Sequence, residues 1–238
     1  TFGPKLRQDD LLGVWPSAYP SDGVLFVLNQ AGANDTYSKK MGAGAGITWS
    51  HEKLVASALF VSEDASNSSI GFLADEGKDH TTAQLAWVDE KYTLSAAYTQ
   101  ADNGNTDNSP DINDYSSFGI SGSYQFGDDY SLSAGMGWKN PDNDDSPDTS
   151  MNKVEDGNTW SIGFLWNNAL IEGNKFGFGI GTAETHRDDS GYDDPLAWEA
   201  FYDFKVNDSV TVTPAIFVIE KDGKEDVNGA LVKTTFNF

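Results

Sequence analysis

The stretch YSLSAGMGW, residues 130–138, decides the fold class of this chain. Every second residue is apolar, from Tyr130 to Trp138, and every residue between them is serine or glycine. A repeat of two residues puts the apolar side chains on one face of an extended segment and the small side chains on the other. The stretch is therefore predicted to be a β-strand with one apolar face and one face that carries little bulk.

The same alternation recurs along the whole chain and indicates about twelve strands. They are expected at 1–7, 38–50, 53–63, 81–89, 92–101, 118–126, 130–138, 160–166, 176–181, 196–206, 210–221 and 229–238. The one helix candidate is 22–31, which the pattern fits equally well as a strand. Phe201 interrupts the polar face of its strand, and we expect a loop to cover it.

The connections between these strands alternate in length. Short ones contain 51–52, 89–91, 127–129, 170–173 and 207–209, and long ones are 8–37, 63–80, 102–114, 140–157, 187–195 and 222–228. This order is typical of an up-and-down antiparallel sheet whose two rims face different compartments. A sandwich with Greek-key crossings would not keep it so strictly.

The placement of charged residues predicts that the strands cross a membrane. The formal net charge is −22, which disfavours nucleic acid as a partner. The acids concentrate in the long connections, whereas the face opposite the apolar one is mostly serine, glycine and threonine. A soluble sheet would carry charges on that face. The sequence thus predicts an all-β, up-and-down transmembrane β-barrel over 1–238, with outer-membrane lipid around it. A soluble secreted sandwich or solenoid is the alternative.

Other classes of structure are disfavoured by what the sequence lacks. It contains no cysteine, so it has no disulfide framework and no cysteine metal site. It has no run of 18 apolar residues, so a transmembrane helix is not predicted.

The stretch GALVKTTFNF, 229–238, carries the alternation to its last residue. Strand ends usually fray unless they are paired. We therefore expect both edges of this strand to be paired in a closed barrel. Phe236 and Phe238 are expected to lie at the membrane boundary on the rim of the short connections and to act as an assembly signal.

Three stretches carry a resemblance to a known family: GPKLRQDDLLGVWPSAYPSD at 3–22, TYSKKMGAGAGITWS at 36–50, and VTVTPAIFVIEKDG at 210–223 with the strand that follows. The chain resembles cyanobacterial outer-membrane porins of the carbohydrate-selective porin family, many of which carry an SLH (surface-layer-homology) domain. The resemblance implies transport of ions and small hydrophilic solutes, including carbohydrates. It also implies insertion by the barrel-assembly machinery, a homotrimer, and a peptidoglycan link through an N-terminal domain missing here. Since fourteen to sixteen strands are then expected, we interpret the chain as the C-terminal part of a larger barrel.

The connection after the first strand is the best candidate for a pore constriction. Lys5, Arg7, Asp9 and Asp10 place two cations and two anions within six residues. Inside a pore they would set a transverse field and a size limit. Trp15 and Tyr19 would stack against a sugar or anchor the loop to the wall. The alternative is a solvated external loop.

Glu199, Asp203 and Lys205 are predicted to point inward as a charged ladder, with a merely wet interior as the alternative. No enzyme signature is found: GAGAG at 42–46 and FGFGIG at 176–181 lie within strands and do not fit a dinucleotide fingerprint. The three histidines lack metal-ligand spacing. We therefore predict no catalytic residue, no cofactor and no metal site. The acidic connections are candidates for loose Ca²⁺ or Mg²⁺ binding, with plain solvated charge as the alternative.

Two functions follow from this sequence. The first is a passive porin with a water-filled lumen and weak cation preference, since net acidity concentrates cations at the mouth. The second is a plugged structural barrel or surface receptor whose acidic loops bind a partner. Glycine and serine on the inner face predict room for water, which favours the porin.

Overall fold

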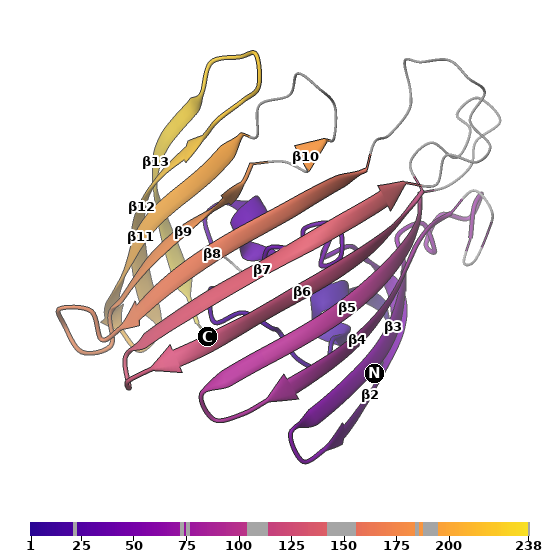
Figure 1. Cartoon of the computed structure of the whole chain (residues 1–238), viewed down its shortest axis with the longest axis horizontal. Helices are drawn as coiled ribbons and strands as arrows, with labels where there is room; N and C mark the ends of the chain where they lie inside the picture. The colour runs from indigo at the N-terminus through magenta and orange to yellow at the C-terminus, as the bar shows by residue number, and fades with distance from the viewer. Residues whose placement is uncertain are drawn as a thin grey trace.

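The fold is one curved antiparallel sheet that wraps around the N-terminal part of the chain (Figure 1). The computed structural model describes residues 1–20, 23–71, 74, 77–103, 114–141, 156–183, 186–187 and 195–237. The strands are β1 (Phe2–Arg7), β2 (Met41–His51), β3 (Leu54–Ser62), β4 (Lys78–Val88), β5 (Tyr92–Asn103), β6 (Tyr115–Phe126), β7 (Tyr130–Pro141), β8 (Gly157–Asn167), β9 (Lys175–Thr182), β10 (His186–Arg187), β11 (Leu196–Asn207), β12 (Val210–Ile219) and β13 (Val227–Phe236).

The strand order confirms the predicted up-and-down class. Apart from the two-residue β10, which pairs with β8, every strand pairs with its neighbour in the chain. Two short helices lie outside the sheet, α1 (Gln8–Leu11) and the 3₁₀-helix η1 (Phe26–Asn29). η1 falls within the helix candidate 22–31, whereas α1 was not predicted. In the part of the chain that the structure describes, no helix is both long enough and apolar enough to cross a membrane.

The two rims differ as predicted. The tight connections lie on one rim, called here the short-turn rim, and the longer ones on the other, the long-connection rim (Figure 1). Phe236 pairs with Val210, which begins β12 directly after a tight turn. The last strand therefore ends at the short-turn rim, as expected, while Phe238 lies outside the described residues.

The sheet does not close on itself. Over the described residues β13 pairs only with β12 and β1 only with β2, so these two strands are its edges. The expectation that both edges of the last strand are paired is not met here. The confirmed part of the fold prediction is the antiparallel up-and-down sheet, and its closure into a barrel stays a prediction.

The two faces of the sheet differ in polarity. On the convex outer face, large apolar side chains such as Ile47 (72% exposed) and Leu94 (56%) stand in the open. On the concave inner face, small and polar side chains such as Ser95, Thr99 and Ser117 are buried. An ordinary soluble sheet has the reverse arrangement, because its apolar face is the one that packs.

Residues 8–20 and 23–40 lie against the inner face, and we call them the internal segment. The backbone N of Gln8 donates to the carbonyl of Lys40 (2.9 Å), so the segment leaves the sheet after β1 and returns to it at β2. Between these points it runs along the concave side of the sheet, with α1 and η1 inside the curve (Figure 1). Its ends meet and its side chains pack, as in a large Ω-loop.

Candidate functional site: the internal segment and the inner wall

Hydroxyl groups of the inner wall bind the backbone of the internal segment. Ser133 Oγ accepts a hydrogen bond from the backbone N of Ala18 (2.8 Å). Ser121 Oγ donates to the carbonyl of Ala31 (2.6 Å). Turns within the segment satisfy only some of its backbone groups, such as the N–H of Tyr37, which donates to the carbonyl of Ala33 (2.8 Å), so buried polar partners must satisfy others. The serines and threonines of the wall therefore replace water as partners of this segment.

Two glutamine side-chain amides also bind backbone carbonyls of the segment. Gln8 is fully buried, and its Nε2 donates to the carbonyl of Thr36 (2.9 Å) and to Thr82 Oγ1 (2.7 Å). Gln84 from β4 donates to the carbonyl of Val14 (2.9 Å). Both amides connect the segment to β4, so the start of the internal segment, from Gln8 to Val14, is fixed to an early strand.

The middle of the internal segment is anchored to β11 by one carboxylate. Glu199 is fully buried. It accepts hydrogen bonds from Tyr19 Oη (2.6 Å), from the backbone N of Val24 (3.3 Å) and from the backbone N of Leu25. A buried carboxylate is stable only where donors compensate its lost hydration. These three donors all come from the internal segment, so Glu199 is an anchor for it.

An apolar cluster surrounds this anchor. Tyr19, Leu25 and Leu28 from the segment pack with residues of β8, β11 and β12, namely Leu165, Ala197, Phe201 and Ala215. The rings of Tyr19 and Phe201 meet edge to face, with centroids 5.9 Å apart. The prediction that a loop covers Phe201 is confirmed.

The glycines of the inner face permit this close approach. A Cβ added to Gly163 would lie 2.6 Å from the ring of Tyr19, and one added to Gly135 would lie 1.9 Å from the carbonyl oxygen of Ala31. Real side chains never approach so closely. The prediction that these small residues leave room for water is therefore wrong where the segment lies, because the segment itself occupies the space.

The four charged constriction candidates are only partly brought together. Arg7 makes a two-pronged pair with Asp9, with Nη2 2.6 Å from Oδ2. Asp10 stays exposed and accepts from the backbone N of Arg7 (3.3 Å). Lys5 is exposed on β1. The structure thus joins Arg7, Asp9 and Asp10 at the entrance to the internal segment and leaves Lys5 apart.

The two aromatic candidates are used within the protein. Tyr19 is 4% exposed and bound to Glu199, so of its two predicted roles the anchoring one is found. Trp15 lies edge to face with Tyr37 (5.6 Å), and Lys39 Nζ stands 4.9 Å above its ring. Lys39 Nζ also donates to Asn29 Oδ1 (2.8 Å). These contacts hold the segment together and were not predicted.

The three inward candidates on β11 do not form a continuous ladder. Glu199 is covered by the segment, as described above. Asp203 Oδ1 accepts from Thr213 Oγ1 (2.6 Å), and Lys205 is exposed and pairs with Asp208 (2.8 Å). Asp203 faces a hollow that also holds Lys175 and Lys233, two residues that the sequence did not single out.

Two charge clusters lie at the rims. At the long-connection rim, Glu63 lies 3.2 Å from both His80 Nε2 and Lys40 Nζ. The hydrogen bond with His80, helped by Lys40, holds the pKa of Glu63 below its usual range, against the opposing effect of burial. At the short-turn rim, the hydrogen bond from Lys53 lowers the pKa of Asp89.

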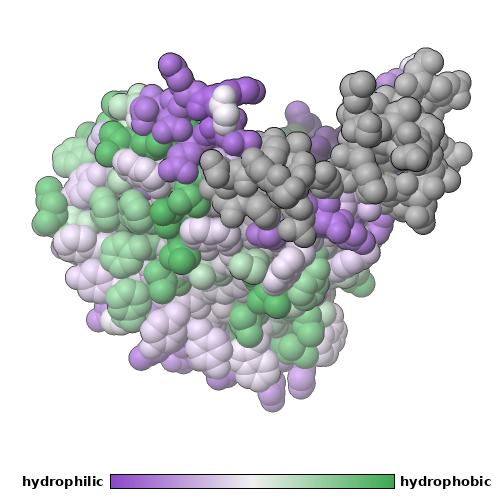
Figure 2. Space-filling view, turned by 45° about the horizontal axis from the view of Figure 1, so that its top comes forward, coloured by the Kyte–Doolittle hydropathy of each residue, from purple (hydrophilic) through white to green (hydrophobic). Residues whose placement is uncertain are grey.

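The outer face carries two rows of aromatic side chains. Near the short-turn rim Tyr124, Phe126, Tyr130, Phe164 and Trp166 form a continuous row with centroids 5.7–6.4 Å apart. Near the other rim Phe118 stacks on Trp138 (6.0 Å). Hydrophobic residues cover much of the outer face, and hydrophilic residues gather at the long-connection rim (Figure 2).

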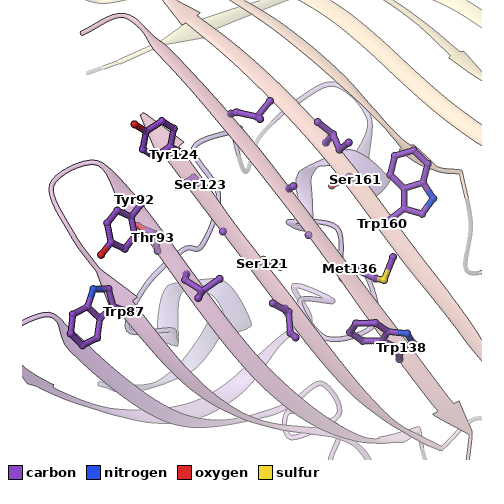
Figure 3. A pocket seen from close by; sticks show the side chains of 17 residues that line it. Trp87, Tyr92, Thr93, Ser121, Ser123, Tyr124, Met136, Trp138, Trp160 and Ser161 are labelled. Carbon is purple, nitrogen blue, oxygen red and sulfur yellow. The ribbon is translucent and has the colours of Figure 1, made fainter. Parts of the chain in front are cut away.

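A groove of about 790 Å³ lies between these rows. Gly122 and Ala134 lie side by side at its floor, and Leu94 and Ile162 flank them in the same cross-strand row. Tyr92 and Tyr124 stand at one end, and Trp138 and Trp160 at the other (Figure 3). None of its lining residues is charged.

A metal site is not found among the described residues, where no group of three or more His, Asp or Glu side chains is arranged to hold an ion. Most of the acidic stretches proposed for Ca²⁺ or Mg²⁺ lie outside those residues. Loose binding there stays a prediction.

The chain matches no known protein family, no curated protein and no solved structure. The resemblance to cyanobacterial porins therefore stays a prediction.

Proposed function

We propose that this chain forms the membrane-spanning wall of an outer-membrane porin, in which the internal segment narrows a channel for ions and small hydrophilic solutes. The observation that carries the proposal is the polarity of the sheet. Its apolar side chains stand on the convex outside, and its polar side chains lie on the concave inside. Strands that cross a membrane require this arrangement, because lipid contacts the outside.

The dimensions of the outer face support a bilayer crossing. On β7, Tyr130 in one aromatic row and Trp138 in the other are eight residues apart, about 27 Å along the strand. A tilt of 35–45° would shorten this to about 20 Å along the membrane normal, close to the ~25 Å apolar band of known barrels. A soluble protein would pay about 1.5–3 kcal/mol for each large apolar side chain left in water.

A second candidate is a plugged barrel that serves as a structural element or a surface receptor. Its support is the close packing of the internal segment against Gly135 and Gly163 and the satisfaction of its backbone by the wall. In a porin the segment would narrow the channel along one wall. In a plugged barrel it would be part of a complete closure.

Conductance of the purified protein in planar bilayers tests the proposal. A porin gives stepwise ohmic currents whose ion selectivity changes when Asp9→Asn or Arg7→Gln alters the entrance pair. As a matched control, Asp128→Asn removes an exposed carboxylate from the tight turn between β6 and β7. Bilayers that stay silent although the protein has inserted would favour the plugged barrel.

Further expectations from the resemblance belong to the same proposal: residence in the outer membrane, insertion by the barrel-assembly machinery, a homotrimer and a peptidoglycan link through a separate domain. Fractionation of the cell envelope and cross-linking of the membrane-embedded protein test the location and the trimer.

A further inference from the structure

The connection between β8 and β9 presents two large apolar side chains at the short-turn rim. Leu170 is 82% exposed and Ile171 is 55% exposed, and we call this pair the apolar tip. The structure describes all five short connections, and the other four consist of charged or small residues: 52–53, 89–91, 127–129 and 208–209. Single apolar residues are common on protein surfaces, whereas adjacent ones that protrude together mark a site of contact.

The backbone of this connection is unfavourable for a leucine. Leu170 has a φ of 63°, in the left-handed region where glycine and asparagine are the usual residues. Asn168 (φ 53°) and Gly173 (φ 86°) adopt the same region in the same connection, and both are residues of the favoured types. Leu170 therefore neither eases its own turn nor packs within the protein. A residue that costs stability in both ways is expected where its side chain makes an external contact.

Hydrogen bonds below the apolar tip hold the connection in this shape. Asn168 Oδ1 accepts from the backbone N of Gly173 (2.9 Å), and Asn168 Nδ2 donates to Asp129 Oδ1 (2.7 Å) in the neighbouring turn. The backbone N of Ala169 donates to the carbonyl of Asn174 (3.1 Å), and both of these residues are buried. The exposed pair thus stands on a hydrogen-bonded support, which displays the two side chains in one arrangement.

The support also joins the connection to the outer face of the sheet. Tyr202 Oη donates to the carbonyl of Ala169 (2.7 Å) and accepts from Asn174 Nδ2 (2.9 Å). Tyr202 is the cross-strand partner of Phe176, and Phe176 is the partner of Trp166. Cross-strand partners share a face, so these residues extend the outer aromatic row near the short-turn rim from β8 to β11. The apolar tip lies beside this row, and the connection stands out from the rim, away from the internal segment (Figure 1).

We propose that the apolar tip inserts into the membrane leaflet at the short-turn rim, at the boundary between the lipid headgroups and the acyl chains. Aromatic rows mark this level in membrane barrels, and aliphatic side chains gain free energy when they move from water into that boundary. Glu172, the next residue, is exposed. Its carboxylate limits the depth of insertion, because an unpaired charge is not stable among acyl chains.

The inference rests on the proposed function, since it requires that lipid surrounds the outer face. It goes further by assigning a lipid contact to a connection, where a plain up-and-down wall has only a wet turn. Continuity of the apolar tip with the aromatic row favours lipid over a protein as its partner. The tip would then fix the depth of β8 and β9 in the membrane, while the four charged or polar turns stay in water.

Site-specific fluorescence in phosphatidylcholine vesicles tests the insertion. The chain contains no cysteine, so one introduced cysteine carries the only label. Leu170→Cys and Ile171→Cys place a fluorophore on the apolar tip, and Glu90→Cys, at the exposed turn between β4 and β5, is the matched control. Lipids with a nitroxide near the headgroup should quench the labels at 170 and 171 at least about threefold more than the label at 90, and aqueous iodide should show the reverse. Ile162→Cys, on the outer face of β8, reports separately whether the wall is in lipid.

The label at 162 separates the two proposals. If lipid nitroxides along the acyl chain quench it while iodide reaches 170 and 171 as readily as 90, the insertion is refuted and the membrane wall stands. Labels at 170 and 171 that are shielded from both quenchers would indicate a protein contact and would also overturn the insertion. A label at 162 that is open to iodide would refute the wall and the insertion together.

A second variant tests the role of the leucine itself without disturbing the turn. Asparagine tolerates the left-handed region, so Leu170→Asn should keep the fold of the connection and remove its apolar contact. Combined with Ile171→Cys, it should raise iodide quenching of the label at 171 at least about twofold, because the shortened apolar tip inserts less deeply. Unchanged quenching in this double variant would count against the insertion.

Discussion

The replacement Glu199→Ala should release the middle of the internal segment from the wall. It removes the acceptor of Tyr19 Oη and of the backbone N–H groups of Val24 and Leu25, all from a buried place. A buried donor left without an acceptor costs about 1–3 kcal/mol. With two of the three donors well placed, we expect the docked state of the segment to lose about 3 kcal/mol relative to an undocked one.

Amide hydrogen exchange of the purified protein measures this loss. Because 1.4 kcal/mol corresponds to a factor of ten, amides of residues 23–31 should exchange about 100-fold faster in Glu199→Ala. Tyr19→Phe deletes a single hydrogen bond and should give about a fivefold increase. Glu220→Ala is the matched control, since its carboxylate accepts from the backbone N of Leu196 (2.9 Å) without touching the segment. Unchanged exchange over 23–31 in Glu199→Ala would refute the assignment of Glu199 as the anchor.

Three further predictions concern packing, pH and the membrane. Gly135→Ala should lower the stability of the folded protein by about 1–3 kcal/mol, because the new methyl group would overpack against the segment. Gly3→Ala is the control and should have little effect, because its new methyl group would make contacts of ordinary length. Thermal unfolding in detergent compares the two variants. The pKa of Glu63 is depressed in the folded protein, so its ionised carboxylate stabilises the fold above the ordinary glutamate pKa of about 4.3. This stabilisation is lost as the pH falls through the depressed pKa. Exchange near the ends of β3 and β4 should therefore accelerate below about pH 4, less so in Glu63→Gln. In single-tryptophan variants that retain Trp138 or Trp166, the tryptophan fluorescence should be quenched most by lipids brominated near the headgroup. Equal quenching by aqueous acrylamide and by brominated lipid would contradict the membrane orientation.

The sheet was predictable from the sequence because the signal is local. The alternation in stretches such as 130–138 requires only that neighbouring residues face opposite ways. The short and long connections then follow from the spacing of the strands, and the position of Phe236 at the short-turn rim follows from both. The bounds of the strands shift by a few residues because pairing, and not polarity, decides where a strand ends.

The contents of the concave side could not be predicted in this way. Serine and glycine at positions such as 133 and 135 fit equally well beside water or beside another piece of chain. The partner of Ser133 is Ala18, 115 residues away, and that of Glu199 is Tyr19, 180 residues away. Contacts between residues so far apart leave no periodic pattern in the sequence. Phe201 was the one visible sign, because a large ring on a polar face requires a cover.

The hollow with Lys175 and Lys233 was missed for the same reason. The two lysines lie 58 positions apart, and only the register of four strands brings them to one level. Glu199, Asp203 and Lys205 were found because they lie on one strand, where a period of two is enough. The partners of these three residues could not be predicted, because they depend on tertiary contacts: Glu199 binds the internal segment, Asp203 binds Thr213, and Lys205 binds Asp208 in a turn.

The path of the internal segment has a consequence for the order of folding. The sheet is built from pairings between neighbours in the chain, so each hairpin can form with a small loss of chain entropy. The internal segment is different: its anchor on Glu199 does not exist until β11 is in place, although residues 8–40 are synthesised first. The part of the segment that Glu199 holds, Val24 and Leu25 among it, must therefore remain undocked while about 150 residues of sheet assemble, and it docks as one of the last steps. We expect pulsed hydrogen exchange during refolding to protect the amides of Val24 and Leu25 later than the amides of the strands.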